Sequence, residues 1–230
     1  KAICISHGHV DHIGALPAFL GMRGLFGQRE SITVYCPKAI EKSLAEGLRA
    51  FELMQTFDFN VKIVGLSPGD EVNISKRRKL RAFRTYHPVA SLGYVVYEPI
   101  QKLKPEFMGL PGTELKRLRL AGDDIFHHHE RRYFAYVTDT LPEVLKHEPW
   151  LSDVEQLMLE CTFLDERKTV KDARRGGHIH LDELLPWLRR LRNKRIHLIH
   201  FSQLYSPNDI RKILKTRYDA SDGPEVVPLL

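Results

Sequence analysis

Four residues of metal-binding type, three histidines and an aspartate, stand within six positions near the start of the 230-residue chain: His7, His9, Asp11 and His12. They follow residues 2–6, a short apolar run typical of a buried strand. Imidazole nitrogens and carboxylate oxygens are ligands that Zn²⁺ prefers. In an extended chain, residues two apart point the same way, so His7 and His9 can hold one ion and the next pair a second. We interpret the cluster as a metal site rather than a solvated loop.

Short apolar strands alternate with amphipathic helices along the rest of the chain. The pattern predicts strands over 2–6, 32–35, 61–64, 81–86, 92–97, 133–137, 157–159 and 196–199. It predicts helices over 13–21, 37–54, 181–191 and 207–217. This mixed order favours the α/β class, and the length fits a single domain over residues 1–230.

Composition excludes some classes of protein. No run approaches the ~18 consecutive apolar residues of a membrane helix, so we expect no membrane association through a spanning segment. Thirty-five Lys and Arg against 29 Asp and Glu give a net charge of +6, which permits a polyanionic partner such as RNA without requiring one. Cys4, Cys36 and Cys161 form no CxxC pair, which favours free thiols in a reducing cytoplasm, with an organelle as the alternative.

Three further polar residues stand where predicted strands end: His87, Asp139 and His200. Active sites of α/β proteins form where strands stop and loops begin. We therefore expect these three side chains to join the histidine cluster.

The pattern His7-x-His9-x-Asp11-His12, followed by His87, Asp139 and His200, resembles the metallo-β-lactamase superfamily of dinuclear hydrolases. Within it the chain is most similar to the ribonuclease Z family, on smaller motifs. These are a Ser-x-Gly-Tyr segment after His87, a Gly-Leu-Pro stretch between 103 and 122, the Leu-Glu-Cys-Thr box at 159–162, and Gly177-His178 ahead of 198–202. The likeness extends from residue 1 to about residue 217.

The resemblance implies a fold and a set of ligands. The fold is the αββα sandwich, with the metals at one edge between two mixed sheets. His7, His9 and His87 would bind one divalent ion, and Asp11, His12 and His200 a second, with Asp139 bridging. Zn²⁺ is the expected metal and Mn²⁺ the alternative.

It also implies catalytic roles for Asp11, Glu160 and His178. Asp11 would accept a proton from the attacking water, and His178, oriented by Glu160, would stabilise or protonate the leaving oxygen. Substrate-binding residues stay unassigned.

The implied activity is that of a zinc-dependent endoribonuclease that removes the 3′ trailer of precursor tRNA, which would be the partner. A homodimer is expected from the family. Two alternatives stay open: hydrolysis of a small phosphodiester, lactone or arylsulfate, and a non-catalytic RNA-binding or scaffold subunit.

The chain departs from the family pattern in several places, among them Leu159, where the family has a histidine, and Val10, where a glycine is common. Residues 178–180 are His-Ile-His where the family has His-Ser-Thr, and we expect His180 to face solvent. Family members also carry strands ahead of the histidine motif, so we interpret this chain as a fragment.

Several charged segments have two interpretations. Residues 127–129, three histidines, are expected in a solvated hairpin tip. Residues 98–126 are expected to form a surface excursion. The basic runs over 76–81, 116–119 and 189–195 are either solvated faces or contacts for RNA phosphates.

Overall fold

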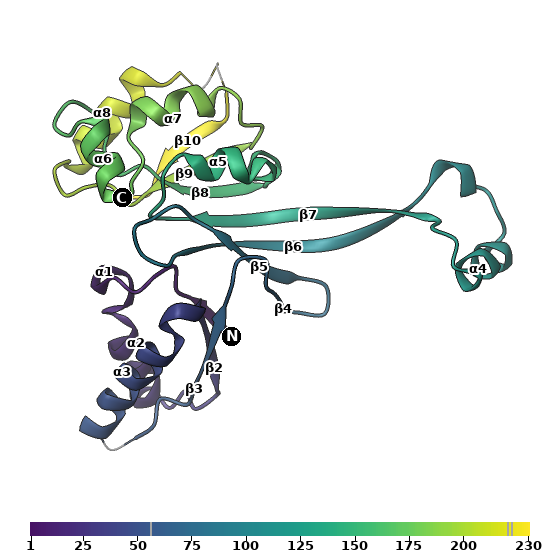
Figure 1. The fold of residues 1–230 in the computed structure, drawn as a ribbon, viewed down its shortest axis with the longest axis horizontal. Helices are drawn as coiled ribbons and strands as arrows, with labels where there is room; N and C mark the ends of the chain where they lie inside the picture. Colours follow the sequence, from purple (N-terminus) through teal and green to yellow (C-terminus); the bar gives the residue numbers. More distant parts are fainter. Residues whose placement is uncertain (56, 220, 222) are drawn as a thin grey trace.

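The chain forms two β-sheets with helices on their outer faces (Figure 1), as described by a computed structural model for all residues except 56, 220 and 222. The first sheet contains β1 (Ala2–Cys4), β2 (Ile32–Pro37) and β3 (Val61–Leu66), in that order and all parallel. Helices α1 (Val10–Ile13), α2 (Leu16–Leu25) and α3 (Glu41–Met54) connect these strands. Such helical crossovers return the chain to the end of the sheet where the previous strand began, so the next strand runs parallel to it. The expectation of two mixed sheets is therefore wrong for this sheet.

The second sheet is mixed and has seven strands in the order β10-β9-β8-β7-β6-β5-β4. Its parallel part contains β7 (Phe126–Val137), β8 (Gln156–Glu160), β9 (Arg195–Ile199) and β10 (Glu225–Pro228). Its antiparallel part adds β6 (Leu92–Leu103), β5 (Lys79–Arg84) and β4 (Glu71–Asn73) to β7. The edge strands β4 and β10 were not predicted from the sequence.

Four helices lie on the outer side of the second sheet: α5 (Glu143–His147), α6 (Val170–Gly176), α7 (Leu181–Leu188) and α8 (Pro207–Arg217). Helix α8 begins where its sequence predicts, because Ser206 and Asp209 form a reciprocal capping box and Pro207 occupies the first turn.

Three apolar clusters hold the layers together. One packs α2 and α3 against the first sheet through Leu20, Val34 and Leu48, and another packs α7 and α8 against the second sheet through Leu184 and its neighbours. The third lies between the sheets, where side chains of both sheets meet around Leu80 and Ala82. The order of layers is therefore helix, sheet, sheet, helix, which confirms the αββα sandwich.

A long arm protrudes from the sandwich (Figure 1). Strands β6 and β7 are each 12 residues long and continue as a two-stranded ladder, from Glu98 paired with Arg131 to Leu103 paired with Phe126. Helix α4 (Gly112–Ala121) lies at the far end. The expected surface excursion is thus an ordered arm, and both strands extend well past the boundaries that the sequence predicts.

Candidate metal centre

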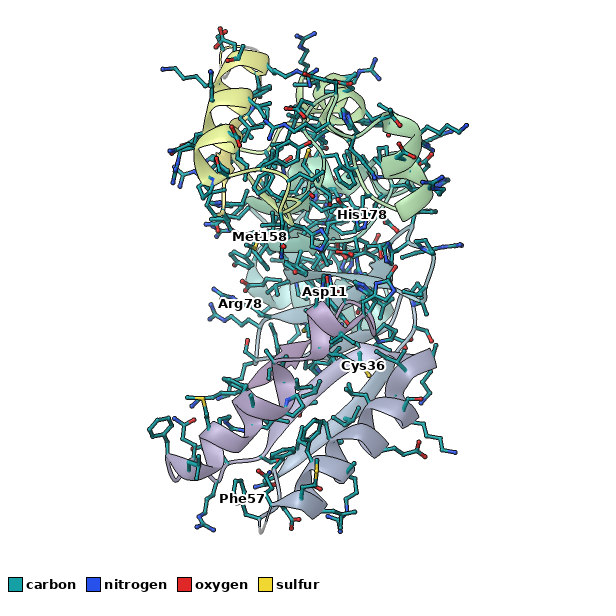
Figure 2. The ribbon with its side chains drawn as sticks, turned by 90° about the vertical axis from the view of Figure 1, so that its left-hand side faces the viewer. Asp11, Cys36, Phe57, Arg78, Met158 and His178 are labelled. Carbon is teal, nitrogen blue, oxygen red and sulfur yellow. The ribbon has the colours of Figure 1, made fainter. Side chains whose placement is uncertain are left out.

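The predicted ligands come from loops that follow strands of both sheets and meet at one place. His7 follows β1, His87 follows β5, Asp139 follows β7 and His200 follows β9. Figure 2, viewed from the side away from the arm, shows Asp11 and His178 in the middle of the molecule, where its two halves meet.

One group of ligand atoms comprises His7, His9, His87 and Asp139, all within 4.8 Å of one another. His9 Nδ1 lies 3.0 Å from His7 Nε2 and 3.4 Å from His87 Nε2. Oδ2 of Asp139 lies 3.6 Å from His7 Nε2 and 3.9 Å from His87 Nε2. This is the set of four that the resemblance assigns to one ion and its bridging carboxylate.

A second group comprises Asp11, His12 and His200. The other oxygen of Asp139, Oδ1, lies 3.3 Å from His12 Nε2 and 3.2 Å from His200 Nε2. The two carboxylate oxygens of Asp139 therefore face different groups, which is the geometry that a bridging ligand needs. All seven residues predicted as ligands lie at this centre.

The backbone is held in unusual conformations at two of these residues. Asp139 and His200 have positive φ angles of 43° and 62°. A left-handed conformation costs a residue other than glycine of the order of 1 kcal/mol or more, and such strain gathers at functional sites. His200 directly follows β9 and Asp139 stands two residues after the end of β7, so the turn out of each strand aims the side chain at the centre.

Gly177 fixes the orientation of His87. The carbonyl oxygen of Gly177 lies 3.2 Å from His87 Nδ1, so a proton on Nδ1 leaves Nε2 to face the centre. Gly177 has φ of 77°, and a Cβ there would lie 2.3 Å from Pro88 Cδ. Only glycine allows this approach, which explains the Gly177-His178 pair of the sequence.

The charge states of the centre follow from burial and from Asp139. Burial lowers the pKa of His7 to about 4 and also lowers the pKa of His87, so both imidazoles are neutral at pH 7. Burial alone would raise the pKa of Asp139, but contacts with His12, His200 and Thr138 outweigh it and hold that pKa below its usual range. Asp139 in turn raises the pKa of His12.

These residues fit a metal centre by their own chemistry. Neutral imidazoles and an ionised carboxylate are the forms that bind divalent cations. His12 Nε2 is buried and has no well-directed hydrogen bond, although Asp139 lies beside it. A buried polar atom without a partner is costly, and an ion between the two would satisfy it.

Glu160 and His178 form a hydrogen-bonded pair beside the centre. Glu160 is fully buried, and its Oε1 lies 3.2 Å from His178 Nδ1. Burial lowers the pKa of His178, but the hydrogen bond and charge of Glu160 outweigh this and raise it. The other ring nitrogen, Nε2, is left for a ligand, and the ring stacks on that of His200 with centroids 5.3 Å apart.

The sequence does not reveal how many contacts Glu160 makes. Besides His178, it accepts hydrogen bonds from the backbone N–H of Thr140 at 2.6 Å, from that of Ile179 at 3.2 Å and from the Thr162 hydroxyl at 2.6 Å. Glu160 therefore joins the loops that carry Asp139 and His178 to Thr162, whose hydroxyl lies beside His200.

Thr162 is a further residue of the site that the ligand pattern missed. Its hydroxyl donates to Glu160 and lies 3.0 Å from His200 Nδ1, so its oxygen can accept a hydrogen bond from Nδ1–H and leave Nε2 to face the centre. Its position as the last residue of the Leu-Glu-Cys-Thr box is the one signal in the sequence that points to it.

Two predictions about histidines need correction. His180 does not face solvent: it is buried and caps α7, accepting a hydrogen bond from Asp182 N–H at 3.1 Å. The histidines at 127–129 are exposed, as expected, but they lie in strand β7 of the arm rather than in a hairpin tip. Neither set belongs to the metal centre, because His180 turns toward its own helix and the arm points away.

The fold and the centre define a metal-binding protein of the β-lactamase superfamily. A profile described as "Beta-lactamase superfamily domain" matches residues 1–108. The structure is similar to the metallo-beta-lactamase fold protein YhfI of Bacillus subtilis, with a TM-score of 0.63 at 17% identity, over 100% of this chain and 74% of that one. It is similar to the human short-form tRNase Z, with a TM-score of 0.60 at 18% identity, over 99% of this chain and 75% of that one.

Sequence relatives identify the branch. The chain is 36% identical to tRNase Z TRZ1 of Arabidopsis thaliana, over 90% of this chain and 74% of the relative. It is 30% identical to the chloroplastic tRNase Z TRZ2 of the same plant, over 100% of this chain and 65% of the relative. The chain belongs to the ribonuclease Z (tRNase Z) family.

Proposed function

We propose that the chain is the catalytic part of a metal-dependent endoribonuclease that removes the 3′ trailer of precursor tRNA. The proposal depends chiefly on one observation in this chain of the ribonuclease Z family. The two carboxylate oxygens of Asp139 face two different groups of histidines. That arrangement suits two divalent ions, Zn²⁺ first and Mn²⁺ as the alternative.

The ligands are divided between the two ions as the resemblance implies. His7, His9 and His87 would hold one ion, Asp11, His12 and His200 the other, and Asp139 both. Ions so bound would supply Lewis acidity to the phosphodiester and lower the pKa of a water molecule toward about 7.

The chain's own residues would handle the protons. The Asp11 carboxylate is 69% exposed, with Oδ2 3.5 Å from His12 Nε2, so it is open to substrate and can accept a proton from the attacking water. His178 keeps a proton more readily than a free histidine because Glu160 raises its pKa, and it would give a proton from Nε2 to the leaving ribose oxygen.

The arm supports RNA as the substrate. It places helix α4, with the basic run 116–119, far from the metal centre (Figure 1). Within that run Arg117 is paired with Glu114, whereas Lys116 and Arg119 are in none of the ion pairs of the described residues. Long-range contacts of this kind suit a large polyanion better than a small ester.

The direct test is incubation of the full-length protein with a 3′-extended precursor tRNA and Zn²⁺ or Mn²⁺, with the cut position mapped. We expect a single cut next to the discriminator base. Absence of that cut with bis(p-nitrophenyl) phosphate or a lactone still hydrolysed would instead support the small-substrate alternative. RNA binding without hydrolysis of either would support the scaffold alternative.

We also propose that the protein forms a homodimer. Phe19 and Met22 of α2, and Phe26 directly after it, are 47–73% exposed and lie three and four positions apart, so they form an apolar stripe. Such a stripe can pack against its own copy about a two-fold axis. Phe26→Glu should turn a dimer into a monomer in sedimentation experiments, and a monomeric wild type would refute this.

The domain organisation and the location of the protein stay predictions. A single domain over 1–230 is supported by the apolar cluster shared by both sheets. None of the helices in the described part of the chain is long and apolar enough to cross a membrane. A cytoplasmic or organellar location stays a prediction; one relative is named chloroplastic.

A further inference from the structure

The basic run over 76–81 is divided in two by the structure. Lys79 and Arg81, in β5, both contact Glu71, and Arg81 also pairs with Glu130 of the arm. Residues 76–78, a lysine and two arginines, lie in the turn between β4 and β5, where all three are exposed. None of these three takes part in an ion pair within the described residues. The turn therefore presents three cations that form no ion pair with a carboxylate of the described residues.

The backbone of this turn is closed by its own hydrogen bonds. The Ser75 hydroxyl oxygen accepts from the N–H groups of Arg77 and Arg78, at 3.4 and 3.0 Å. The Arg78 carbonyl accepts from the N–H groups of Ile74 and Ser75, at 3.0 and 3.2 Å. The hydrogen bonds that close the turn therefore do not involve the basic side chains.

The turn faces the root of the arm across a hollow of about 750 Å³. The hollow, which we name the arm-root hollow, is lined chiefly by Lys76, Arg77, Arg78, Glu98, Arg131 and Tyr133. The guanidinium carbons of Arg78 and Arg131 lie 4.6 and 4.8 Å from the centroid of the Tyr133 ring. These cation–π contacts hold two arginines in place at the wall of the hollow.

The charge of the hollow is positive. Its one carboxylate, Glu98, accepts a hydrogen bond from the Tyr133 hydroxyl at 2.6 Å, and Arg131 is paired with Glu155. Glu98 keeps its negative charge, but the three turn cations outnumber it, so the lining has an excess of positive charge. Guanidinium groups present several N–H donors in a planar fork that matches the oxygens of a phosphate. An anionic ligand with phosphate chemistry is therefore the one that this hollow suits.

The same face of the arm continues outward from the hollow. Residues two apart on a strand share a face, so His129 and His127 follow Arg131 along β7, and Lys102 of β6 lies opposite His127. From 133 to 127 this face extends over roughly 20 Å at the usual rise per residue of a strand. A track of cationic and aromatic side chains of that length suits a polynucleotide backbone better than a small anion.

We propose that the arm-root hollow binds the phosphate backbone of RNA, as a contact separate from the metal centre and from helix α4. The identity of that RNA as a precursor tRNA rests on the proposed function, whereas binding of RNA in the hollow does not require cleavage. Residues 76–78 would supply the phosphate contacts, and Arg131 with Tyr133 the wall against which the backbone lies.

The test compares two double variants that remove the same charge. Lys76→Ala with Arg77→Ala removes two cations from the hollow. Arg189→Ala with Arg190→Ala removes two exposed cations of another basic run, which are likewise in no ion pair of the described residues. Binding of a fluorescent precursor tRNA is measured by anisotropy in a chelator, so that no cleavage occurs, at several salt concentrations.

We expect the hollow variant to bind RNA about 3- to 10-fold more weakly, and the slope of log K against log salt to fall by about 1 to 2. The control variant should change both much less. Equal affinities and slopes for the two double variants would overturn the proposal. So would a loss that appears when inorganic pyrophosphate is the titrant but not with RNA, since the hollow would then serve a small anion.

Hydrolysis of bis(p-nitrophenyl) phosphate should be the same in both variants, which shows that the fold and the metal centre are intact. Failure of the wild type to cut precursor tRNA at one position would count against the proposed function only. The difference in RNA affinity between the variants would still decide whether the hollow is an RNA site.

Discussion

The metal centre and the arm are built by opposite means. The centre gathers side chains from residue 7 to residue 200, and none of its groups is complete without at least two distant segments. The arm is local, because it consists of two adjacent strands and the residues between them. Changes at the centre should therefore affect chemistry on every substrate, whereas changes in the arm should affect only large ligands.

The largest effect is expected from Asp139→Ala, because one side chain serves both groups of ligands. Hydrolysis of precursor tRNA and of bis(p-nitrophenyl) phosphate should fall together, by about 10³-fold or more. Metal content, measured by mass spectrometry, should fall too, and a chelator should reproduce the loss in the wild type. Asp153→Ala, at an exposed ion pair with Arg192, is the matched control and should change little. Retained turnover in the Asp139 variant would remove it from the centre.

The next largest effects are expected from His178→Ala and Glu160→Ala, which together distinguish the catalytic role of this pair from its structural role. His178→Ala should lower turnover on both substrates by about 10²-fold with little loss of stability. Glu160→Ala should lower turnover similarly and also reduce the free energy of unfolding by about 3 kcal/mol, because it leaves the buried N–H groups of Thr140 and Ile179 unpaired. Denaturant unfolding measures the stability of both variants. Equal free energies of unfolding for the two variants would contradict the structural role of Glu160.

Shortening the arm should give an effect on RNA alone. Gln101 pairs with His128, so residues 102–127 can be replaced by a two-residue Asn-Gly turn that closes the same ladder. We expect KM for precursor tRNA to rise by roughly 10- to 100-fold, with kcat nearly unchanged, because the lost contacts serve binding rather than chemistry. The rate on bis(p-nitrophenyl) phosphate should stay constant. A parallel loss on the small ester would mean that the arm supports the centre.

The smallest effect is expected at the junction of arm and sandwich. The Tyr97 hydroxyl, together with Arg81 and Lys79, lowers the pKa of Glu71 from 4.5 to about 2. Because the folded state lowers this pKa, the carboxylate stabilises the fold above pH 4.5 and loses that contribution as pH falls toward 2. Glu71→Gln should reduce the free energy of unfolding by about 1 kcal/mol at pH 7, allowing for solvent screening, and by almost nothing near pH 2. A difference that does not depend on pH would exclude this mechanism.

The ligands of the centre could be predicted from the sequence because their signals are local. His7, His9, Asp11 and His12 are close in the chain, and the other three ligands stand within three residues of the ends of strands whose apolar runs are clear. The supporting residues could not be predicted in the same way. Thr162 and Gly177 act through contacts with His200 and His87, and those contacts exist only once four loops have met.

In the arm, the sequence underestimates the length of the strands. Its strands are at least twice as long as the apolar runs that predicted them, because the outer halves include charged and histidine side chains on a ladder without a core. Residues 127–129 are unremarkable as strand formers, and pairing with residues 100–102 holds them extended. The prediction that His180 faces solvent was wrong for a related reason. A histidine that caps a buried helix start has the same sequence signature as one in solvent.

The sequence by itself determined which chemical groups the protein has for a metal centre, the alternation of strands and helices, and the family. These depend on residue types and on spacings within a few positions, which local geometry translates directly into structure. Only the tertiary structure decided that Asp139 faces two groups, that Glu160 joins the loops of Asp139 and His178, and that the cations of 76–78, which form no ion pair within the described residues, face the arm. Those facts depend on strand pairing and on packing between distant segments, which no local pattern encodes.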